Sequence, residues 1–184
     1  MGRLTTWVPG LTFVALVFGT NLAFAQDYPK GDVFGGFSIL AIENGGDADV
    51  GFQASVAVNL NKRVGLVADF GRHTSSETIL GFNVSGSLNQ FLFGPRFNWR
   101  TPRLTSFVHG LIGPVRGSAA ATALGLKVTD TFFAAAVGGG VDVKAGRNVA
   151  VRVIQADLFM GCPFDECQGD IRTGFGIVIL FGQP

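Results

Sequence analysis

Side-chain character alternates with a period of two along most of the chain after residue 31. The pattern is clearest in the segments 52–60, 66–71, 90–99, 132–143 and 174–181. Within the first segment, for example, Phe52 and Val56 occupy one parity, while Gln53 and Ser55 occupy the other. Successive side chains of a β-strand point to opposite faces, so this spacing predicts strands.

Extending the alternation predicts eight strands: 32–42, 49–60, 64–73, 87–100, 104–116, 130–145, 148–160 and 170–182. Each has about the length that crosses a membrane at a tilt. Helical spacing is absent from these segments, and their many glycines disfavour helices. The predicted fold class is all-β, as an eight-stranded antiparallel up-and-down transmembrane β-barrel.

The connections between the predicted strands fall into two classes that alternate strictly. The short turns are 61–63, 101–103 and 146–147. The longer loops are 43–48, 74–86, 117–129 and 161–169. Outer-membrane barrels show this asymmetry, with short periplasmic turns and longer external loops.

The first 25 residues have the pattern of an export signal. Arg3 provides positive charge, an apolar core runs from Leu11 to Gly19, and Ala23-Phe24-Ala25 suits cleavage before Gln26. A transmembrane anchor is the alternative, but the apolar stretch is short, and Pro9 and Asn21 lie just before and just after it. We expect a signal peptide at 1–25 and one barrel domain at 26–184.

The composition suits strands that face lipid. Hydrophobic residues make up 47% of the chain and charged residues 15%, and glycine (27) and phenylalanine (18) are abundant. Soluble proteins carry about a quarter charged residues. The net charge is +1 and there is no basic block, which excludes a typical nucleic-acid-binding protein.

Single charges of both signs occur on the face of small or polar residues, deep within the predicted strands. They are Asp69, Arg96, Asp142, Arg152 and Asp157. A narrow lumen needs few charges, paired with one another, because an unpaired buried charge is costly. We predict a lumenal charge network of these residues. The alternative is ordinary solvated charges on a soluble sandwich.

The seventh predicted strand interrupts the alternation, because Arg152 and Asp157 are an odd number of positions apart. A β-bulge near Val153-Ile154 would direct Asp157 into the lumen. Otherwise Asp157 lies beyond the lipid zone. Aromatic residues near strand ends, Trp99 at one rim and Phe70, Phe133 and Phe159 towards the other, are typical of interfacial girdles.

Four segments together resemble the small OmpA-like outer-membrane β-barrel domain proteins. They are Phe34-Gly35-Gly36-Phe37-Ser38, residues 59–69, Phe91-Leu92-Phe93-Gly94-Pro95-Arg96-Phe97 and Gly138-Gly139-Gly140-Val141-Asp142. The resemblance implies a monomeric barrel in the bacterial outer membrane, in contact with lipid and lipopolysaccharide.

The same resemblance implies that the barrel-assembly machinery reads the C-terminal strand through Gly176, Ile179 and Phe181. The chain departs from the usual signal at Gly174 and in Gly182-Gln183-Pro184, which follow the final aromatic residue. Recognition of this strand by that machinery is therefore an expectation from the resemblance.

The two cysteines, Cys162 and Cys167, lie in one predicted loop. In an exported protein such a pair predicts a disulfide. A metal site is the alternative, but no histidine lies nearby and two ligands are too few. No other residues have metal-ligand spacing, and we expect no metal and no cofactor.

No catalytic motif stands out. Gly138-Gly139-Gly140 opens no helix, so it is not a phosphate loop. His73 and Ser75, with Glu77 following, share a strand face at the outer rim and resemble the arrangement of barrel enzymes that deacylate lipid A. A polar rim explains the same residues. His109, in mid-strand, is expected to pack in or near the lumen.

These features predict a non-enzymatic outer-membrane protein with a structural or envelope-integrity role, or one that binds partners through loops 74–86 and 117–129. A lipid A-modifying enzyme is one alternative. A lipocalin-like carrier of a small apolar ligand is another, although it predicts an apolar lumen.

Overall fold

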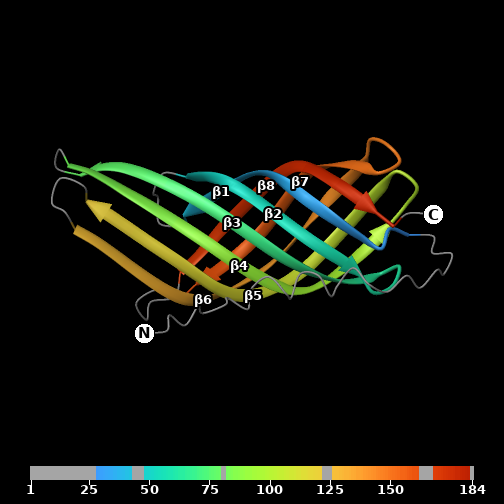
Figure 1. Ribbon diagram of the computed structural model, residues 1–184, viewed down its shortest axis with the longest axis horizontal. Helices are drawn as coiled ribbons and strands as arrows, with labels where there is room; N and C mark the ends of the chain where they lie inside the picture. The colour runs from blue at the N-terminus through green and yellow to red at the C-terminus, as the bar shows by residue number, and fades with distance from the viewer. Residues whose placement is uncertain (1–27, 43–47, 80–81, 122–125, 162–167, 183–184) are drawn as a thin grey trace, which may run out of the picture.

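The eight strands of the chain close into a single antiparallel barrel in which each strand pairs with its neighbours in sequence and β8 pairs with β1 (Figure 1). The computed structural model describes residues 28–42, 48–79, 82–121, 126–161 and 168–182. The strands are β1 (Gly31–Ile42), β2 (Asp49–Asn59), β3 (Val64–Ile79), β4 (Phe82–Arg100), β5 (Leu104–Ala121), β6 (Leu126–Lys144), β7 (Val149–Gly161) and β8 (Gln168–Phe181). The predicted fold class is confirmed. The expected signal segment 1–25 lies outside the described residues.

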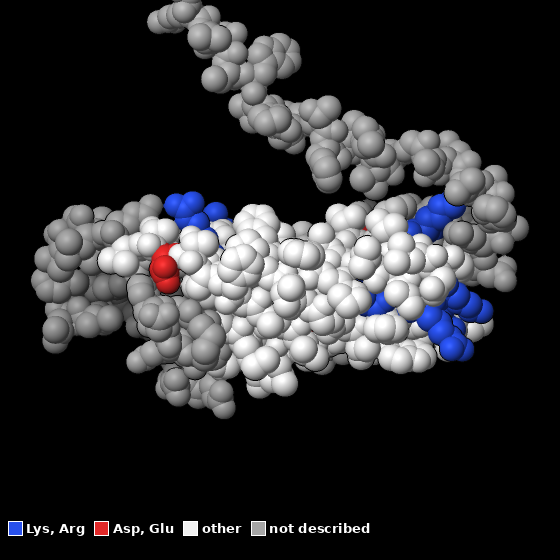
Figure 2. Space-filling view, turned by 90° about the horizontal axis from the view of Figure 1, so that it is seen from below, with Lys and Arg blue, Asp and Glu red and all other residues white. Residues whose placement is uncertain are grey.

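Large apolar side chains point away from the barrel. Phe133 is 76% exposed and Phe37 is 69% exposed, whereas Phe34, of opposite parity to Phe37, is fully buried in the lumen. Figure 2 shows the middle of the visible face without charged residues, which gather towards the two ends. Such a band of exposed apolar surface is stable in contact with hydrocarbon.

Four strands are longer than the sequence predicted. β3 continues to Ile79 and β4 starts at Phe82, so most of the expected loop 74–86 is a paired hairpin. The expected loop 117–129 is likewise largely strand in β5 and β6. Ser, Thr and Gly favour loops by local preference, but cross-strand pairing overrides that preference here. The hydroxyls of Ser118 and Thr129, for example, lie 3.3 Å apart across the pair.

A β-bulge in β7 is confirmed at the predicted place. Val141 pairs with Ile154, and the next residue, Asp142, pairs with Arg152, so Val153 is the extra residue. The register with β8 shifts over the same interval. The bulge reverses the parity that follows it and turns Asp157 inward. It also turns Phe159 inward, to 2% exposure, so the expectation that Phe159 joins an outer aromatic girdle is wrong.

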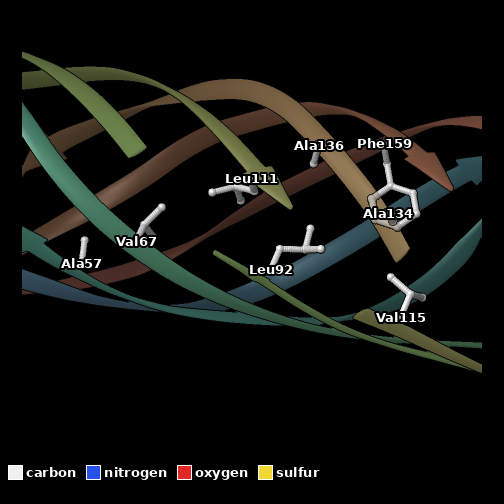
Figure 3. Packing of buried hydrophobic residues seen from close by; sticks show 8 residues of the cluster. All are labelled: Ala57, Val67, Leu92, Leu111, Val115, Ala134, Ala136 and Phe159. Carbon is white, nitrogen blue, oxygen red and sulfur yellow. The ribbon is translucent and has the colours of Figure 1, made fainter. Parts of the chain in front are cut away.

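An apolar cluster fills the lumen beside the charged residues (Figure 3). Its buried members come from β2 to β7: Ala57, Val67, Leu92, Leu111, Val115, Ala134, Ala136 and Phe159. Small residues in this set leave room for larger ones, as expected where eight strands enclose just enough space for side chains. Among the described residues, no helix is long and apolar enough to cross a membrane.

Candidate functional site

Arg172 on β8 is the centre of the lumenal charge network. Its side chain is fully buried, and its guanidinium donates to three strands. Nη1 donates to Asp69 Oδ1 on β3 at 2.8 Å and to Gln90 Oε1 on β4 at 3.0 Å. Nη2 and Nε donate to Asp157 Oδ2 on β7, at 2.7 and 3.1 Å. One cation therefore bridges two buried carboxylates and joins both sides of the lumen.

Amide side chains extend this arrangement. Gln53 Nε2 donates to Asp69 Oδ2 at 2.6 Å, and Gln155 Nε2 donates to Asp157 Oδ2 at 2.8 Å. His109 Nε2 lies 2.8 Å from Asp157 Oδ1. Each buried carboxylate thus has several partners, which the cost of desolvating charge requires.

Arg152 continues the network towards the short-turn end. Its Nη1 donates to Gln155 Oε1 at 2.7 Å, and its Nε and Nη2 donate to the two carboxylate oxygens of Asp142 at 2.8 and 3.2 Å. The guanidinium also lies between two aromatic rings, 4.2 Å from the centroid of Phe34 and 4.4 Å from that of Phe107. A cation over aromatic faces gains attraction that partly replaces its lost hydration.

Arg96 forms a separate buried pair with Asp32. Both of its terminal nitrogens donate to the two oxygens of that carboxylate. Closer to the short turns, Asn59 Oδ1 accepts from Arg100 Nη2 at 2.8 Å, and Asn59 Nδ2 donates to the carbonyl of Pro29 at 2.9 Å. Polar contacts therefore continue to this end of the barrel.

Glycines provide the space that the network occupies. A Cβ on Gly138 would lie 2.1 Å from Asp157 Oδ1 and 2.3 Å from the carbonyl oxygen of Ala156. A Cβ on Gly71 would lie 3.3 Å from Arg172 Nη1. The glycine run on β6 thus serves packing, since a larger residue would occupy the position of the carboxylate.

All five residues of the predicted network are buried in the lumen, but the structure pairs them differently. Asp142 and Arg152 bind each other directly. Asp69 and Asp157 bind Arg172, a residue that the sequence analysis left out. Arg96 pairs with Asp32, also left out, and forms no ion pair with the other four among the described residues. Parity could have found Arg172, because it shares the inward parity of Gly174, Gly176 and Val178.

His73 is fully buried and lies beside a different serine from the one that the sequence analysis considered. Its Nε2 is 2.9 Å from Ser38 Oγ, and Ser38 in turn donates to the carbonyl of Thr173 at 3.1 Å. The side chain of Glu77 lies outside the described region. His109 packs in the lumen as expected, at 5% exposure.

Within the described residues, no three His, Cys, Asp or Glu side chains are grouped as a metal site. Cys162 and Cys167 lie outside the described residues, so their disulfide stays a prediction.

The sequence matches the outer membrane protein beta-barrel domain family over residues 11–154. The chain belongs to this family. As a member, it resides in the bacterial outer membrane, and its band of exposed apolar side chains contacts lipid. No curated protein matches the sequence significantly.

Solved structures of other outer-membrane barrels share the fold of this family member. Ail, the attachment invasion locus protein of Yersinia pestis, was solved with the heparin analogue sucrose octasulfate; it is 16% identical, with a TM-score of 0.60 over 83% of this chain and 99% of Ail. Neisserial surface protein A is 11% identical, with a TM-score of 0.58 over 82% of this chain and 96% of its own. The N-terminal barrel of Pseudomonas aeruginosa OprF is 13% identical, with a TM-score of 0.52 over 84% of this chain and 99% of that barrel.

Membership in the family orients the barrel in its membrane. Outer-membrane barrels place short turns in the periplasm and long connections outside. The connections β2–β3, β4–β5 and β6–β7 therefore face the periplasm, and the extended β3–β4 and β5–β6 hairpins face the exterior (Figure 1). The lumenal charge network lies between these two ends.

Proposed function

We propose that this outer-membrane barrel has a structural, non-enzymatic role in the cell envelope, with a sealed lumen. The observation that carries the proposal is the position of Arg172, whose guanidinium bonds to side chains of β3, β4 and β7 across the interior. Side chains held by several charge-assisted bonds do not move aside for a solute without breaking them. Continuous packing of this kind supports a structural role better than a conducting one.

The enzymatic alternative has less support. A lipid A deacylase needs its histidine and nucleophile at the lipid-facing rim, but His73 is fully buried and lies 2.9 Å from Ser38 inside the barrel. A lipocalin-like carrier also has less support, because the centre of this lumen is occupied by buried Arg, Asp and Gln side chains.

The sealed-barrel proposal is tested with the purified chain in planar lipid bilayers and with cells that lack it. We expect no discrete conductance steps from the wild type. We expect cells without the protein to take up more of a hydrophobic fluorescent probe, and re-expression to restore the barrier. Stable single-channel currents, together with unchanged probe uptake in the deletion strain, would contradict the proposal.

A second candidate function is binding at the cell surface through the extended sheet. Ala134 pairs with Gly161, the last residue of β7, so residues 126–133 of β6 pair only with β5 among the described residues. Thr74 is likewise the last β3 residue with a described partner on β2. Unpaired strand edges of this kind accept an added strand from a partner.

Surface charge favours a protein partner over a polyanion at this end. The described acids there are Asp49, Asp130 and Asp170, and the exposed cations are Arg72 and Arg116. A polyanion such as the heparin analogue found with Ail therefore has few cations to bind at this end of the barrel. Arg72 and Arg116 suit contacts with lipopolysaccharide phosphates, which carry the opposite charge.

Shortening both hairpins tests this second candidate. Replacing residues 77–84 and 120–127 by Asn-Gly turns closes each hairpin beyond the pairs Ser76–Ser85 and Ala119–Val128. Cells that display the wild type should be retained on a surface coated with extracellular-matrix proteins and not on immobilised heparin, and the shortened form should lose that retention. Equal retention of the two forms, each confirmed as folded by heat-modifiability, removes the candidate.

For assembly, we propose that the chain inserts as a monomer and that the barrel-assembly machinery engages β8. Phe181 and Ile179 are the last two residues of that strand on its outward-facing parity, and Ile179 is 55% exposed. Assembly of a Phe181→Ala variant in cells, measured by the fraction that is heat-modifiable, tests this step.

A further inference from the structure

A pocket of about 250 Å³ opens at the periplasmic mouth of the barrel, inside the ring of short turns. Its wall includes Lys62 from the β2–β3 turn, Arg96 and Arg100 from β4, Thr105 from β5 and Lys144 from β6. Four of these five side chains are cations. They come from β4, from β6 and from the β2–β3 turn, so closure of the barrel is what brings them together.

The two carboxylates in the wall are already neutralised. Asp32 accepts two bonds from Arg96, and Asp142 accepts two from Arg152, which lies behind it in the lumen. Lys62 and Lys144 have no ion-pair partner among the residues that the structure describes. The pocket therefore carries an excess of positive charge over the acidic groups that the structure describes around it.

One buried donor in the wall is also unused. Arg96 is 2% exposed, and its Nε has no hydrogen-bond partner in the described part of the chain. Leaving a buried charged group's donor unpaired costs free energy, so buried N–H groups are normally bonded to protein, water or a ligand. An acceptor at the base of the pocket would supply the missing partner once the side chains that cover this nitrogen shift.

The surroundings strengthen this positive potential. Around the pocket lies a set of basic residues, here called the basic rim: Lys30, Lys62, Arg63, Arg100, Arg103, Lys144 and Arg147. Among the described residues at this end, the acids Asp32 and Asp142 are both buried. Figure 2 shows the blue side chains of this end gathered together, with little red among them. A concave site within a field of one sign concentrates ions of the other sign.

We propose that the periplasmic pocket binds a small phosphate-bearing anion. Phosphate accepts bonds from several N–H donors at once, which suits a site with guanidinium and ammonium groups on different sides. Lys62 and Lys144 are the side chains that bind the anion from the rim, and Arg96 Nε donates to it from below. The phosphate is either that of a soluble ester in the periplasm or that of an anionic lipid headgroup in the inner leaflet.

Titration of the purified chain in octyl glucoside, a detergent without phosphate, tests the site. Backbone amide NMR shifts of Thr105 and Lys144 are followed during addition of sodium phosphate or glycerol 3-phosphate, with sodium chloride at matched ionic strength as the reference. We expect saturable shifts with both phosphates and none with chloride. Linear, non-saturating shifts that chloride reproduces would overturn the proposal.

Matched double variants separate a built site from diffuse attraction. Lys62→Gln with Lys144→Gln removes two charges from the pocket, and Arg63→Gln with Arg103→Gln removes two from the rim outside it. The first pair should weaken phosphate binding about tenfold or more, since it removes bonds to a charged group. The second should change it by about twofold or less, because exposed charges are screened. Equal weakening by both pairs, with heat-modifiability intact, would overturn the proposal.

Lipid nanodiscs then distinguish the two sources of phosphate. If the headgroup is the ligand, phosphatidylglycerol nanodiscs produce the bound-state shifts without added phosphate, and phosphatidylcholine nanodiscs do not. If a soluble ester is the ligand, the protein gives the free-state shifts in both kinds of nanodisc. Added glycerol 3-phosphate then moves these shifts to the bound state equally in the two lipids. Nanodisc spectra that phosphate leaves unchanged, with no bound-state shifts in either lipid, would overturn the proposal.

Discussion

Arg172 on β8 and Asp157 on β7 share two hydrogen bonds to a single carboxylate oxygen, from Nη2 at 2.7 Å and from Nε at 3.1 Å. Both side chains are almost completely buried. The remaining terminal nitrogen of Arg172 is turned towards Asp69 and Gln90. Loss of Arg172 would therefore leave two buried carboxylates, Asp69 and Asp157, without their guanidinium partner.

Replacing Arg172 by methionine should strongly destabilise the barrel, because Asp69 and Asp157 would stay buried without their cation. Breaking a buried ion pair from one side costs about 3–5 kcal/mol. The measurement is the free energy of unfolding by urea in lipid vesicles. Arg116→Met is the matched control, since Arg116 is exposed near the long-loop end, and it should have little effect. Similar losses for both variants would argue against the central role of Arg172.

Gly138→Ala should be costly, whereas Gly110→Ala should be tolerated. The new Cβ at Gly138 would collide with Asp157 Oδ1 and with the backbone oxygen of Ala156, whereas nothing lies within 4 Å of a Cβ at Gly110. Overpacking of this kind costs about 1–3 kcal/mol. Urea unfolding of the two variants gives the comparison, and equal stabilities would show that β7 moves aside freely.

Deletion of Val153 should leave a folded barrel. Because Val153 is the extra residue of the bulge, its removal leaves Arg152 opposite Asp142 and Ile154 opposite Val141. Deletion of Leu158, in the regular part of β7, should instead turn every residue on one side of the deletion to the opposite face. Heat-modifiability of the two deletion variants after refolding is the measurement. Loss of folding in both would show that the bulge itself is required.

Cys162 and Cys167 should form a disulfide after export. Intact-mass measurement before and after reduction and alkylation detects it. Replacing both cysteines by serine should cost about 2 kcal/mol of stability, as loop-closure entropy predicts for a short loop. Two free thiols in protein isolated under non-reducing conditions with an alkylating agent would disprove the prediction.

The sequence sufficed for much of the fold, because a period of two is a direct consequence of strand geometry. It identified all eight strands and the bulge at Val153, since an odd spacing between Arg152 and Asp157 conflicts with a regular strand. The hairpin extensions were missed at residues such as Thr74 and Ser118. Serine and threonine have weak local preferences, and their strand state depends on cross-strand partners that a sequence does not identify.

The candidate site was partly predictable for a related reason. Parity places Asp69 and Arg152 in the lumen, but it does not say which residues meet across it. Arg172 reaches Asp69 from a strand that is three neighbours away around the barrel, a contact set by closure and strand tilt. The roles of Asp32 and Ser38 were not predicted. Both residues lie on β1, and a polar side chain on that strand could equally belong to the rim of the barrel.

The basic rim has a consequence for how the barrel enters its membrane. During insertion from the periplasm, the hairpins β3–β4 and β5–β6 must cross the hydrocarbon, whereas the short turns with Arg63, Arg103 and Arg147 need not. Moving arginine or lysine through the bilayer centre is costly. Fewer cations have to cross in this direction than in the reverse one, so the charge distribution favours insertion that leaves the short turns in the periplasm.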